Sequence, residues 1–92
     1  MPLLSESEIK DGLLTLNGWE LKGGEIVKAF KLKNFVEAVG FVNKVAILAE
    51  KADHHPDILI QYRNVKLTLS THSAGGLTEK DFNLAKQIDG LG

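Results

Sequence analysis

The sequence predicts a single α+β domain, with a four-stranded, mainly antiparallel sheet and three helices packed on it in the order αββαββα. Three segments begin with helix-capping residues and continue with apolar residues at helical spacing, and two pairs of strand-like runs are each joined by a short turn. This order of elements is typical of an α+β domain. No repeat or linker interrupts the chain, so residues 1–92 are expected to form one domain.

The first helix is expected over about residues 5–15. Ser5 and Glu8, three positions apart, resemble a capping box, in which each side chain bonds the other residue's backbone N–H. Asn17-Gly18 then ends the helix. The apolar residues of this segment recur at helical spacing: Ile9, Leu13, Leu14 and Leu16.

A β-hairpin is expected next, over about residues 19–32. Residues 19–21 alternate between apolar and polar, Gly23-Gly24 can turn, and residues 26–32 are rich in β-formers. Two strands are therefore expected before the central helix.

A long helix is expected over about residues 35–51, with Asn34 as its N-cap. Its apolar residues occupy more than one face, and in so small a domain one sheet covers only one side of a helix. The other apolar side is then a candidate contact for another subunit or partner. The alternative, a helix that is simply central to its own fold, fits the periodicity equally well.

Two further strands are expected at 58–62 and 65–71, joined at Arg63-Asn64. Alternation along the second strand places His72 on the polar face, together with Lys66, Thr68 and Ser70, and opposite Val65, Leu67, Leu69 and Thr71. A loop over 73–76 follows. Thr78 and Asp81 can cap a last helix that runs through about Ile88.

Composition limits the functions that the chain can have. The net charge is −1 with both signs interspersed, which argues against a nucleic-acid-binding surface and gives no electrostatic reason for membrane binding. The absence of cysteine excludes disulfides, thiolate metal ligands and a cysteine nucleophile. No charged start followed by an apolar run is present, and no segment is apolar enough to span a bilayer, so a cytoplasmic protein is expected.

The chain's three histidines, His54, His55 and His72, lie in one part of the sequence, among polar neighbours. Histidine exchanges protons near neutral pH, so convergent imidazoles indicate either proton transfer or metal ligation. Pro56 places the adjacent pair at a helix exit or in a loop, from which one imidazole can meet His72 across a cleft. The alternative is that all three histidines are ordinary surface residues at the ends of elements.

Two other chemistries fit the pattern less well. Adjacent histidines cannot easily direct both rings at one ion, so no metal site is expected. Nucleophilic catalysis by Ser70 lacks a surrounding nucleophile elbow. General acid–base catalysis on a bound substrate is the remaining interpretation.

Taken together, these residues resemble the signature of pterin-4a-carbinolamine dehydratases, over about residues 3–88. The double histidine followed by proline, with a third histidine 17 positions after His55, is specific only in combination with the rest of the pattern. The matching positions are E-K-x-D-H-H-P at 50–56, Tyr62, Val65, L-T-L-S-T-H at 67–72, Gly18-Trp19, Phe30, Phe35, Phe41, Val42, G-L-T-E-K-D at 76–81 and N-L-A at 83–85.

The resemblance implies the reaction and the roles of the histidines. The substrate would be a 4a-hydroxytetrahydropterin, which loses water to give the quinonoid dihydropterin in tetrahydropterin recycling, without a metal or organic cofactor. His54 and His72 would be the acid and base on opposite sides of the pterin, and His55 would orient or bind the ring.

The resemblance also implies supporting residues. Asp53, Ser70, Thr71, His72 and Ser73 align with substrate-contacting segments. Glu50 would either orient a histidine or be a solvated carboxylate. Asp81 would either serve the site or cap its helix. Trp19 would either line the pterin pocket or belong to the core. Family members commonly carry an acidic residue directly after the third histidine, whereas this chain carries Ser73.

The sequence also bears on self-association and on a second function. A chain this short buries a limited core, which makes a homodimer or homotetramer plausible. Animal relatives also act as dimerisation cofactors for a transcription factor through a helical surface, so a non-enzymatic interaction module using residues 35–51 is the alternative. That role has no physical need for three histidines and Asp53. A third possibility is an enzyme acting on another pterin or a related heterocycle.

Overall fold

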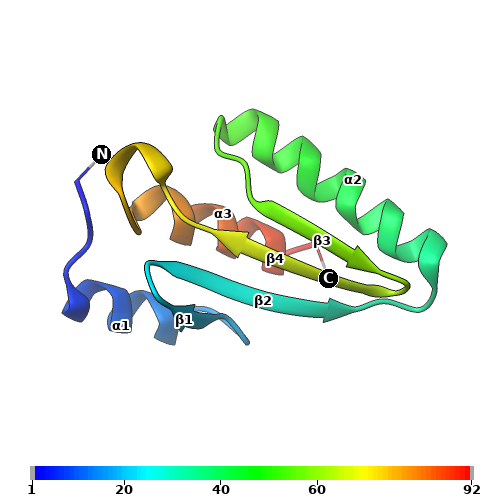
Figure 1. The fold of residues 1–92 in the computed structure, drawn as a ribbon, viewed down its shortest axis with the longest axis horizontal. Helices are drawn as coiled ribbons and strands as arrows, with labels where there is room; N and C mark the ends of the chain where they lie inside the picture. Colours follow the sequence, from blue (N-terminus) through cyan, green and yellow to red (C-terminus); the bar gives the residue numbers. More distant parts are fainter. Residues whose placement is uncertain (1, 92) are drawn as a thin grey trace.

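The computed structural model describes residues 2–91, which fold as three α-helices and a four-stranded antiparallel sheet (Figure 1). The predicted order αββαββα is confirmed. In chain order the elements are α1 (Glu6–Leu14), β1 (Glu20–Lys22), β2 (Glu25–Lys31), α2 (Phe35–Ala52), β3 (Asp57–Gln61), β4 (Asn64–Leu69), the 3₁₀ turn η1 (His72–Ala74) and α3 (Glu79–Asp89).

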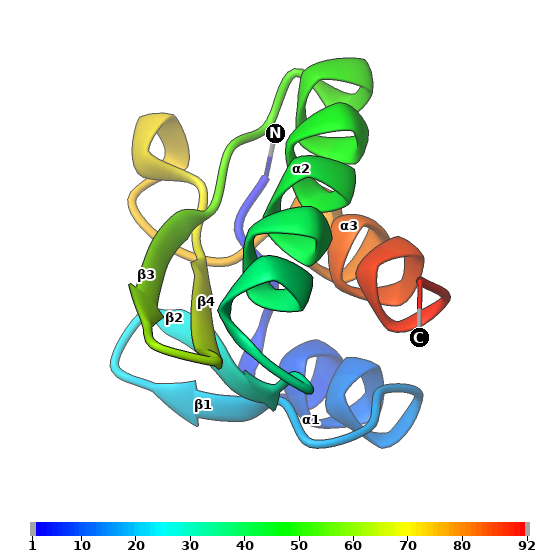
Figure 2. The same ribbon diagram turned by 90° about the vertical axis from the view of Figure 1, so that its right-hand side faces the viewer.

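The sheet has the strand order β1-β2-β4-β3, and each neighbouring pair is antiparallel. The two predicted hairpins therefore join through the central pair β2 and β4, in which Ile26 lies opposite Leu69 and Phe30 opposite Val65. The helices α2 and α3 lie together on one side of the sheet (Figure 2). The other face of the sheet carries polar and apolar side chains together, because Lys66 and Thr68 of β4 lie beside Val27 and Ala29 of β2 and Leu59 of β3.

One core lies between the sheet and the helices. The predicted alternation of β4 is confirmed: its core-facing side chains are fully buried, whereas Lys66 is exposed and Thr68 half-buried. The helix α3 contributes Phe82, Leu84, Ala85 and Ile88 to the same core. The fully buried large side chains are Ile26, Val45, Val65, Leu67, Leu69, Leu84 and Ile88, together with Thr78 and Asp81.

The second hairpin differs from the prediction by one residue. Its turn is Tyr62-Arg63, not Arg63-Asn64, because Gln61 pairs directly with Asn64. Tyr62 has a φ of 55°, a left-handed conformation that tyrosine rarely adopts and that propensity alone does not predict.

The fourth strand also ends earlier than predicted, at Leu69. Thr71 starts a tight turn, in which its carbonyl accepts from the N–H groups of Ala74 and Gly75 at 3.0 Å each. His72 therefore lies in η1 and not on the strand, although its side chain is exposed as the polar face predicted.

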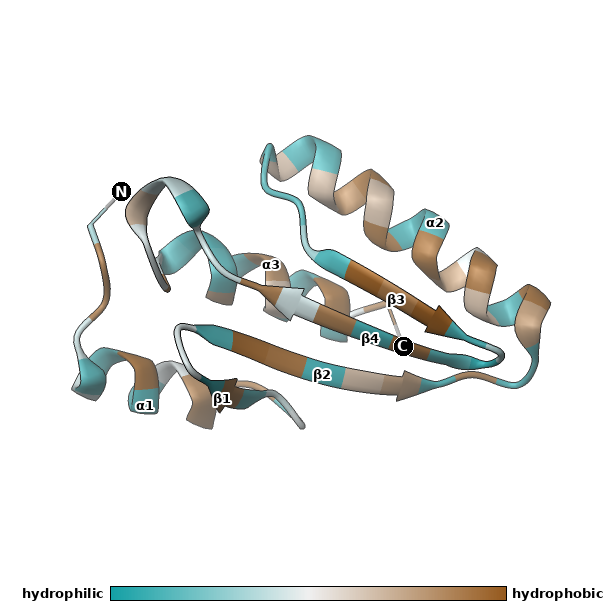
Figure 3. Cartoon of the chain, viewed as in Figure 1, coloured by the Kyte–Doolittle hydropathy of each residue, from teal (hydrophilic) through white to brown (hydrophobic). Residues whose placement is uncertain are grey.

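The long helix α2 has an apolar side that no other part of residues 2–91 covers. Figure 3 shows apolar residues at intervals along its whole length. Phe35 is 53% exposed, Val36 78% and Ile47 58%. The expectation that the sheet covers only one side of this helix is confirmed.

Candidate active site

The C-terminal end of α2 positions the two adjacent histidines. Asp53 caps the helix in the left-handed conformation, with φ 49° and ψ 44°, and the N–H of His54 donates back to the carbonyl of Ala49 at 3.1 Å. The chain then changes direction before Pro56. His54 consequently points inward and is 8% exposed, whereas His55 is exposed.

The imidazole of His54 bonds a buried carboxylate. Its Nε2 lies 2.5 Å from Oδ1 of Asp81, which has no exposed surface. The other carboxylate oxygen, Oδ2, accepts from the Thr71 hydroxyl and from the Thr78 backbone N–H, both at 2.9 Å. The two threonine hydroxyls lie 2.8 Å apart, so Thr78 can donate to Thr71 while Thr71 donates to Asp81. Asp81 thus holds His54 and is itself held by α3 and the η1 turn.

This network determines the tautomer that we infer for His54. An ionised carboxylate only accepts hydrogen bonds, so the Nε2 that meets Asp81 carries the proton. In the neutral imidazole, Nδ1 then keeps its lone pair and is the nitrogen that can accept a proton.

The second histidine of the pair has a different carboxylate partner. The Nε2 of His55 lies 2.5 Å from Oε2 of Glu50, on the last turns of α2. Both side chains are mostly exposed, at 57% for His55 and 77% for Glu50. Glu50 therefore bonds His55, whereas the carboxylate partner of His54 is Asp81. Solvent screens the exposed pair of Glu50 and His55.

All three histidines meet at one cleft. Its volume is about 390 Å³, and the end of α2, the end of β4, η1 and the start of α3 supply its walls. The residues that line this histidine cleft are Asp53, His54, His55, Ser70, Thr71, His72, Ser73 and Lys80.

Two predicted supporting residues have distinct positions. Asp81 does both things that the sequence left open, since it caps α3 and bonds His54. Trp19 belongs to the core, where it is 6% exposed and its indole N–H donates to Asp89 at 3.0 Å. It does not line the histidine cleft.

Sequence reasoning missed one residue that lines this cleft and one that lies behind it. Lys80 lines it, and the Thr78 hydroxyl extends the network behind His54. A signal for Lys80 was present, because a cation in the first turn of a helix is unfavourable for the helix dipole. The role of Thr78 beyond capping depends on a contact with Thr71 that only the folded chain creates.

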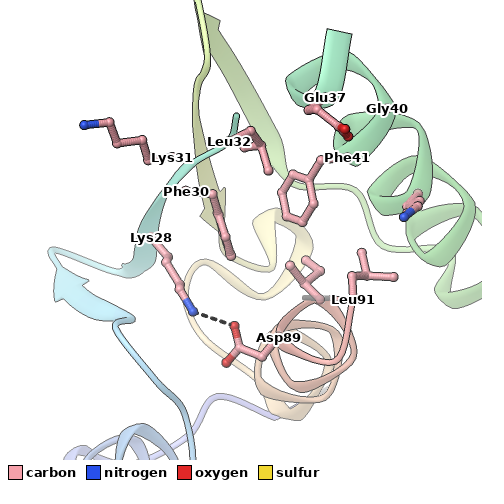
Figure 4. Close-up of a pocket in the computed structure, with 11 residues that line it drawn as sticks. Lys28, Phe30, Lys31, Leu32, Glu37, Gly40, Phe41, Asp89 and Leu91 are labelled. Carbon is pink, nitrogen blue, oxygen red and sulfur yellow. Dashed lines mark hydrogen bonds and ion pairs between the residues drawn. The ribbon is translucent and has the colours of Figure 1, made fainter. Parts of the chain in front are cut away.

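A larger cavity, of about 470 Å³, lies between β2, α2 and the end of α3. Figure 4 shows its apolar wall of Phe30 and Phe41, and the ion pair in which Lys28 Nζ lies 2.9 Å from Oδ1 of Asp89. It contains no imidazole. Size alone therefore does not identify the acid–base site, and the histidine cleft remains the candidate.

Two further features of residues 2–91 concern metal ligands and membrane-spanning helices. No group of three or more histidine, cysteine, aspartate or glutamate side chains is arranged to hold a metal ion. No helix in this range is long and apolar enough to cross a bilayer.

The sequence and structure of the chain are similar to those of known proteins. The family model for pterin 4 alpha carbinolamine dehydratase matches residues 2–91. A protein of Chloroflexus aurantiacus, provisionally named pterin-4-alpha-carbinolamine dehydratase, is 57% identical over 97% of this chain and 96% of its own length. A protein of Sulfolobus acidocaldarius with the same provisional name is 51% identical over 94% of each chain.

Two solved structures have the same fold. The crystal structure of a transcriptional coactivator/pterin dehydratase from Brucella melitensis matches with a TM-score of 0.92 and 41% identity, covering 97% of each chain. A pterin dehydratase-like RuBisCO assembly factor of the alpha-carboxysome matches with a TM-score of 0.64 and 24% identity, over 79% of this chain and 84% of its own, which shows likeness of fold alone. By its family model and its curated relatives, this chain belongs to the pterin-4a-carbinolamine dehydratase family.

Proposed function

We propose that this protein removes water from a 4a-hydroxytetrahydropterin by general acid–base catalysis in the histidine cleft, as a step of tetrahydropterin recycling. The observation that carries the proposal is the convergence of His54, His55 and His72 on one cleft, with His54 held by the buried Asp81. Family membership supports the substrate class.

The reaction requires two proton transfers. The C4a–O bond breaks as the N5 lone pair forms the N5=C4a bond, and the hydroxyl group leaves as water. An acid must protonate that hydroxyl, and a base must collect the proton of N5 to give the neutral quinonoid product. Because both steps occur on adjacent ring atoms, two imidazoles that flank one ring can serve them.

We assign the base to His54 and the acid to His72. The Nε2–H of His54 is bound to Asp81, so Nδ1 is free to take the N5 proton, and Asp81 stabilises the resulting imidazolium. His72 is exposed on η1, where solvent can reprotonate it after it donates to the leaving hydroxyl. His55, oriented by Glu50, would contact the ring.

The polar residues of the cleft would hold the pterin. The hydroxyl of Thr71 is already bonded to Asp81 and Thr78, so its side chain serves the network and not the ligand. Asp53, Ser70 and Ser73 remain to bond the heterocycle. The chemistry needs no cofactor in this scheme, because both proton transfers use side chains of the chain itself.

The proposal is tested by following carbinolamine loss in ultraviolet absorbance, after a hydroxylase generates the substrate. The comparison is between buffer, the protein, its His54→Ala and His72→Ala variants, and Gln87→Ala as a control on the exposed side of α3. General acid–base groups contribute about 10²–10⁴-fold, so each histidine variant should lose most of the acceleration while the control keeps it. If carbinolamine loss is no faster with the folded protein than in buffer, this activity is excluded for that substrate.

A second candidate function rests on the uncovered side of α2. We propose that Phe35, Val36 and Ile47 mediate self-association into a homodimer or homotetramer, or contact with a protein partner, because side chains so exposed and apolar favour burial. Light scattering on a sizing column tests it. Val36→Asp should lower the mass of the assembly, and Lys51→Asp, at the end of the same helix, should not. A monomeric wild-type protein would contradict the self-association.

A further inference from the structure

Lys80 is the only lysine or arginine that lines the histidine cleft. It lies in the first turn of α3 and is half-buried. None of the ion pairs within residues 2–91 includes the ammonium group of Lys80. A half-buried cation facing a cleft is therefore left to interact with whatever enters.

The position of Lys80 is not explained by the stability of its own helix. The first turn of a helix favours anions, because the unpaired N–H groups and the dipole make that end positive. The acidic residues Glu79 and Asp81 fit this preference, whereas the lysine between them opposes it. An unfavourable charge at a cleft indicates a functional constraint.

The carboxylates around the cleft leave the charge of Lys80 uncompensated. Asp81 is buried and bonded to His54, and Glu50 is bonded to His55. Asp53 lines the cleft without pairing with Lys80. The remaining candidate position is 73, on the turn that carries His72, and it holds a neutral serine.

A pterin ring alone gives Lys80 no partner of opposite charge. The ring is neutral, and directional donors and acceptors suit its polar groups better than a point charge does. The reacting atoms C4a and N5 limit where a substituent can lie, because C6 is bonded directly to N5. A side chain on C6 must therefore begin next to the reacting atoms, inside the same cleft.

We propose that Lys80 binds an anionic group, a carboxylate or a phosphate, carried on the C6 side chain of the pterin, and so selects anionic over neutral pterins. This inference rests on the proposed function, because it places the pterin ring among the three histidines. Because position 73 holds a serine, no carboxylate at that position pairs with Lys80, and the ammonium group stays available to an anionic pterin.

The test compares two fluorescent pterins that differ in side-chain charge at the same carbon, 6-carboxypterin and 6-hydroxymethylpterin. Fluorescence titration gives the ratio of their dissociation constants for each variant. A half-buried charge pair is expected to give about a tenfold preference for the carboxylate, weakened by salt. Lys80→Gln should bring the ratio close to one, Lys80→Arg should restore it, and Ser73→Glu should lower it by pairing with Lys80.

The control is Lys86→Gln, which removes the same charge from the exposed side of the same helix and should keep the wild-type ratio. A purely structural role of Lys80 would weaken both ligands equally and leave the ratio unchanged, which would overturn the inference. A protein that dehydrates a neutral carbinolamine but shows no preference for 6-carboxypterin would overturn it while leaving the proposed function intact. A protein that binds neither pterin and does not accelerate carbinolamine loss would overturn both.

Discussion

Replacing Asp81 by asparagine tests the central contact of the site. Asparagine has nearly the same shape, but one of its two terminal groups is a donor. The Thr71 hydroxyl and the Thr78 backbone N–H both donate to the same oxygen of Asp81, so the amide oxygen of asparagine must take that position. The amide NH₂ must then face His54. Nε2 of His54 must then accept, and its proton moves to Nδ1. The variant is expected to present an N–H where the proposed base needs a lone pair.

The size of the effect follows from the three hydrogen bonds that Asp81 accepts. A hydrogen bond to a charged group contributes about 1.5–3 kcal/mol, and a neutral one about 1 kcal/mol. The bond to His54 is exchanged for a neutral one and the other two are weakened, so unfolding should become easier by about 2–3 kcal/mol. The fold is expected to survive, because small domains are stable by about 5–15 kcal/mol. A wrong tautomer in an acid–base site can cost about 10⁴ in rate, and we expect about 10²–10⁴ here.

The assay combines rate and spectroscopy. Nitrogen-15 NMR of the imidazole reports which ring nitrogen of His54 carries the proton, and the absorbance assay gives the rate of carbinolamine loss. Glu79→Gln is the matched control, because it removes an exposed carboxylate from the same helical turn. If Asp81→Asn keeps the proton on Nε2 and keeps the wild-type rate, the inferred role of Asp81 is wrong.

Three further predictions concern backbone and packing, each measured by urea unfolding. Gly12→Ala should destabilise the fold by about 1–3 kcal/mol despite the better helix propensity of alanine, because the new Cβ would lie 2.7 Å from Cε1 of Phe82; an unchanged midpoint would mean that the ring moves aside freely. Asp53→Ala should cost about 1 kcal/mol more than Asp53→Gly at this left-handed cap, and equal values would show that the cap relaxes. Tyr62→Gly should raise stability by about 1 kcal/mol by relieving the positive φ, whereas a loss would indicate that the exposed ring makes stabilising contacts.

Much of the fold follows from local rules that the sequence obeys. The capping boxes of Ser5 with Glu8 and of Thr78 with Asp81 both form, and Asn34 caps α2 as predicted. The alternation along β4 predicts its buried face because a strand has a period of two. The strand order β1-β2-β4-β3 was not predicted, since pairing between distant segments leaves no local signal.

The site was predictable in its residue types and not in its contacts. The spacing of His54, His55 and His72 indicated a cleft, and all three line one. Which carboxylate meets which histidine was not predictable, because Asp81 reaches His54 across 27 positions of the sequence. Such a partner becomes apparent only when α3 is packed against the end of α2. The early end of β4 was missed for a similar reason. The turn at Thr71 is stabilised by backbone hydrogen bonds to the Thr71 carbonyl, which residue preferences do not reveal.

The left-handed residue before the two histidines explains how neighbours in sequence acquire different environments. Continued helix would place His54 and His55 about 100° apart on one cylinder. Asp53 instead turns the chain, so His54 enters the protein and meets Asp81, whereas His55 stays outside and meets Glu50. A carboxylate enclosed by protein donors acts on its imidazole without competition from water, and an exposed one is screened. The two histidines therefore differ in burial and in hydrogen-bond partner because Asp53, directly before them, adopts a left-handed backbone conformation.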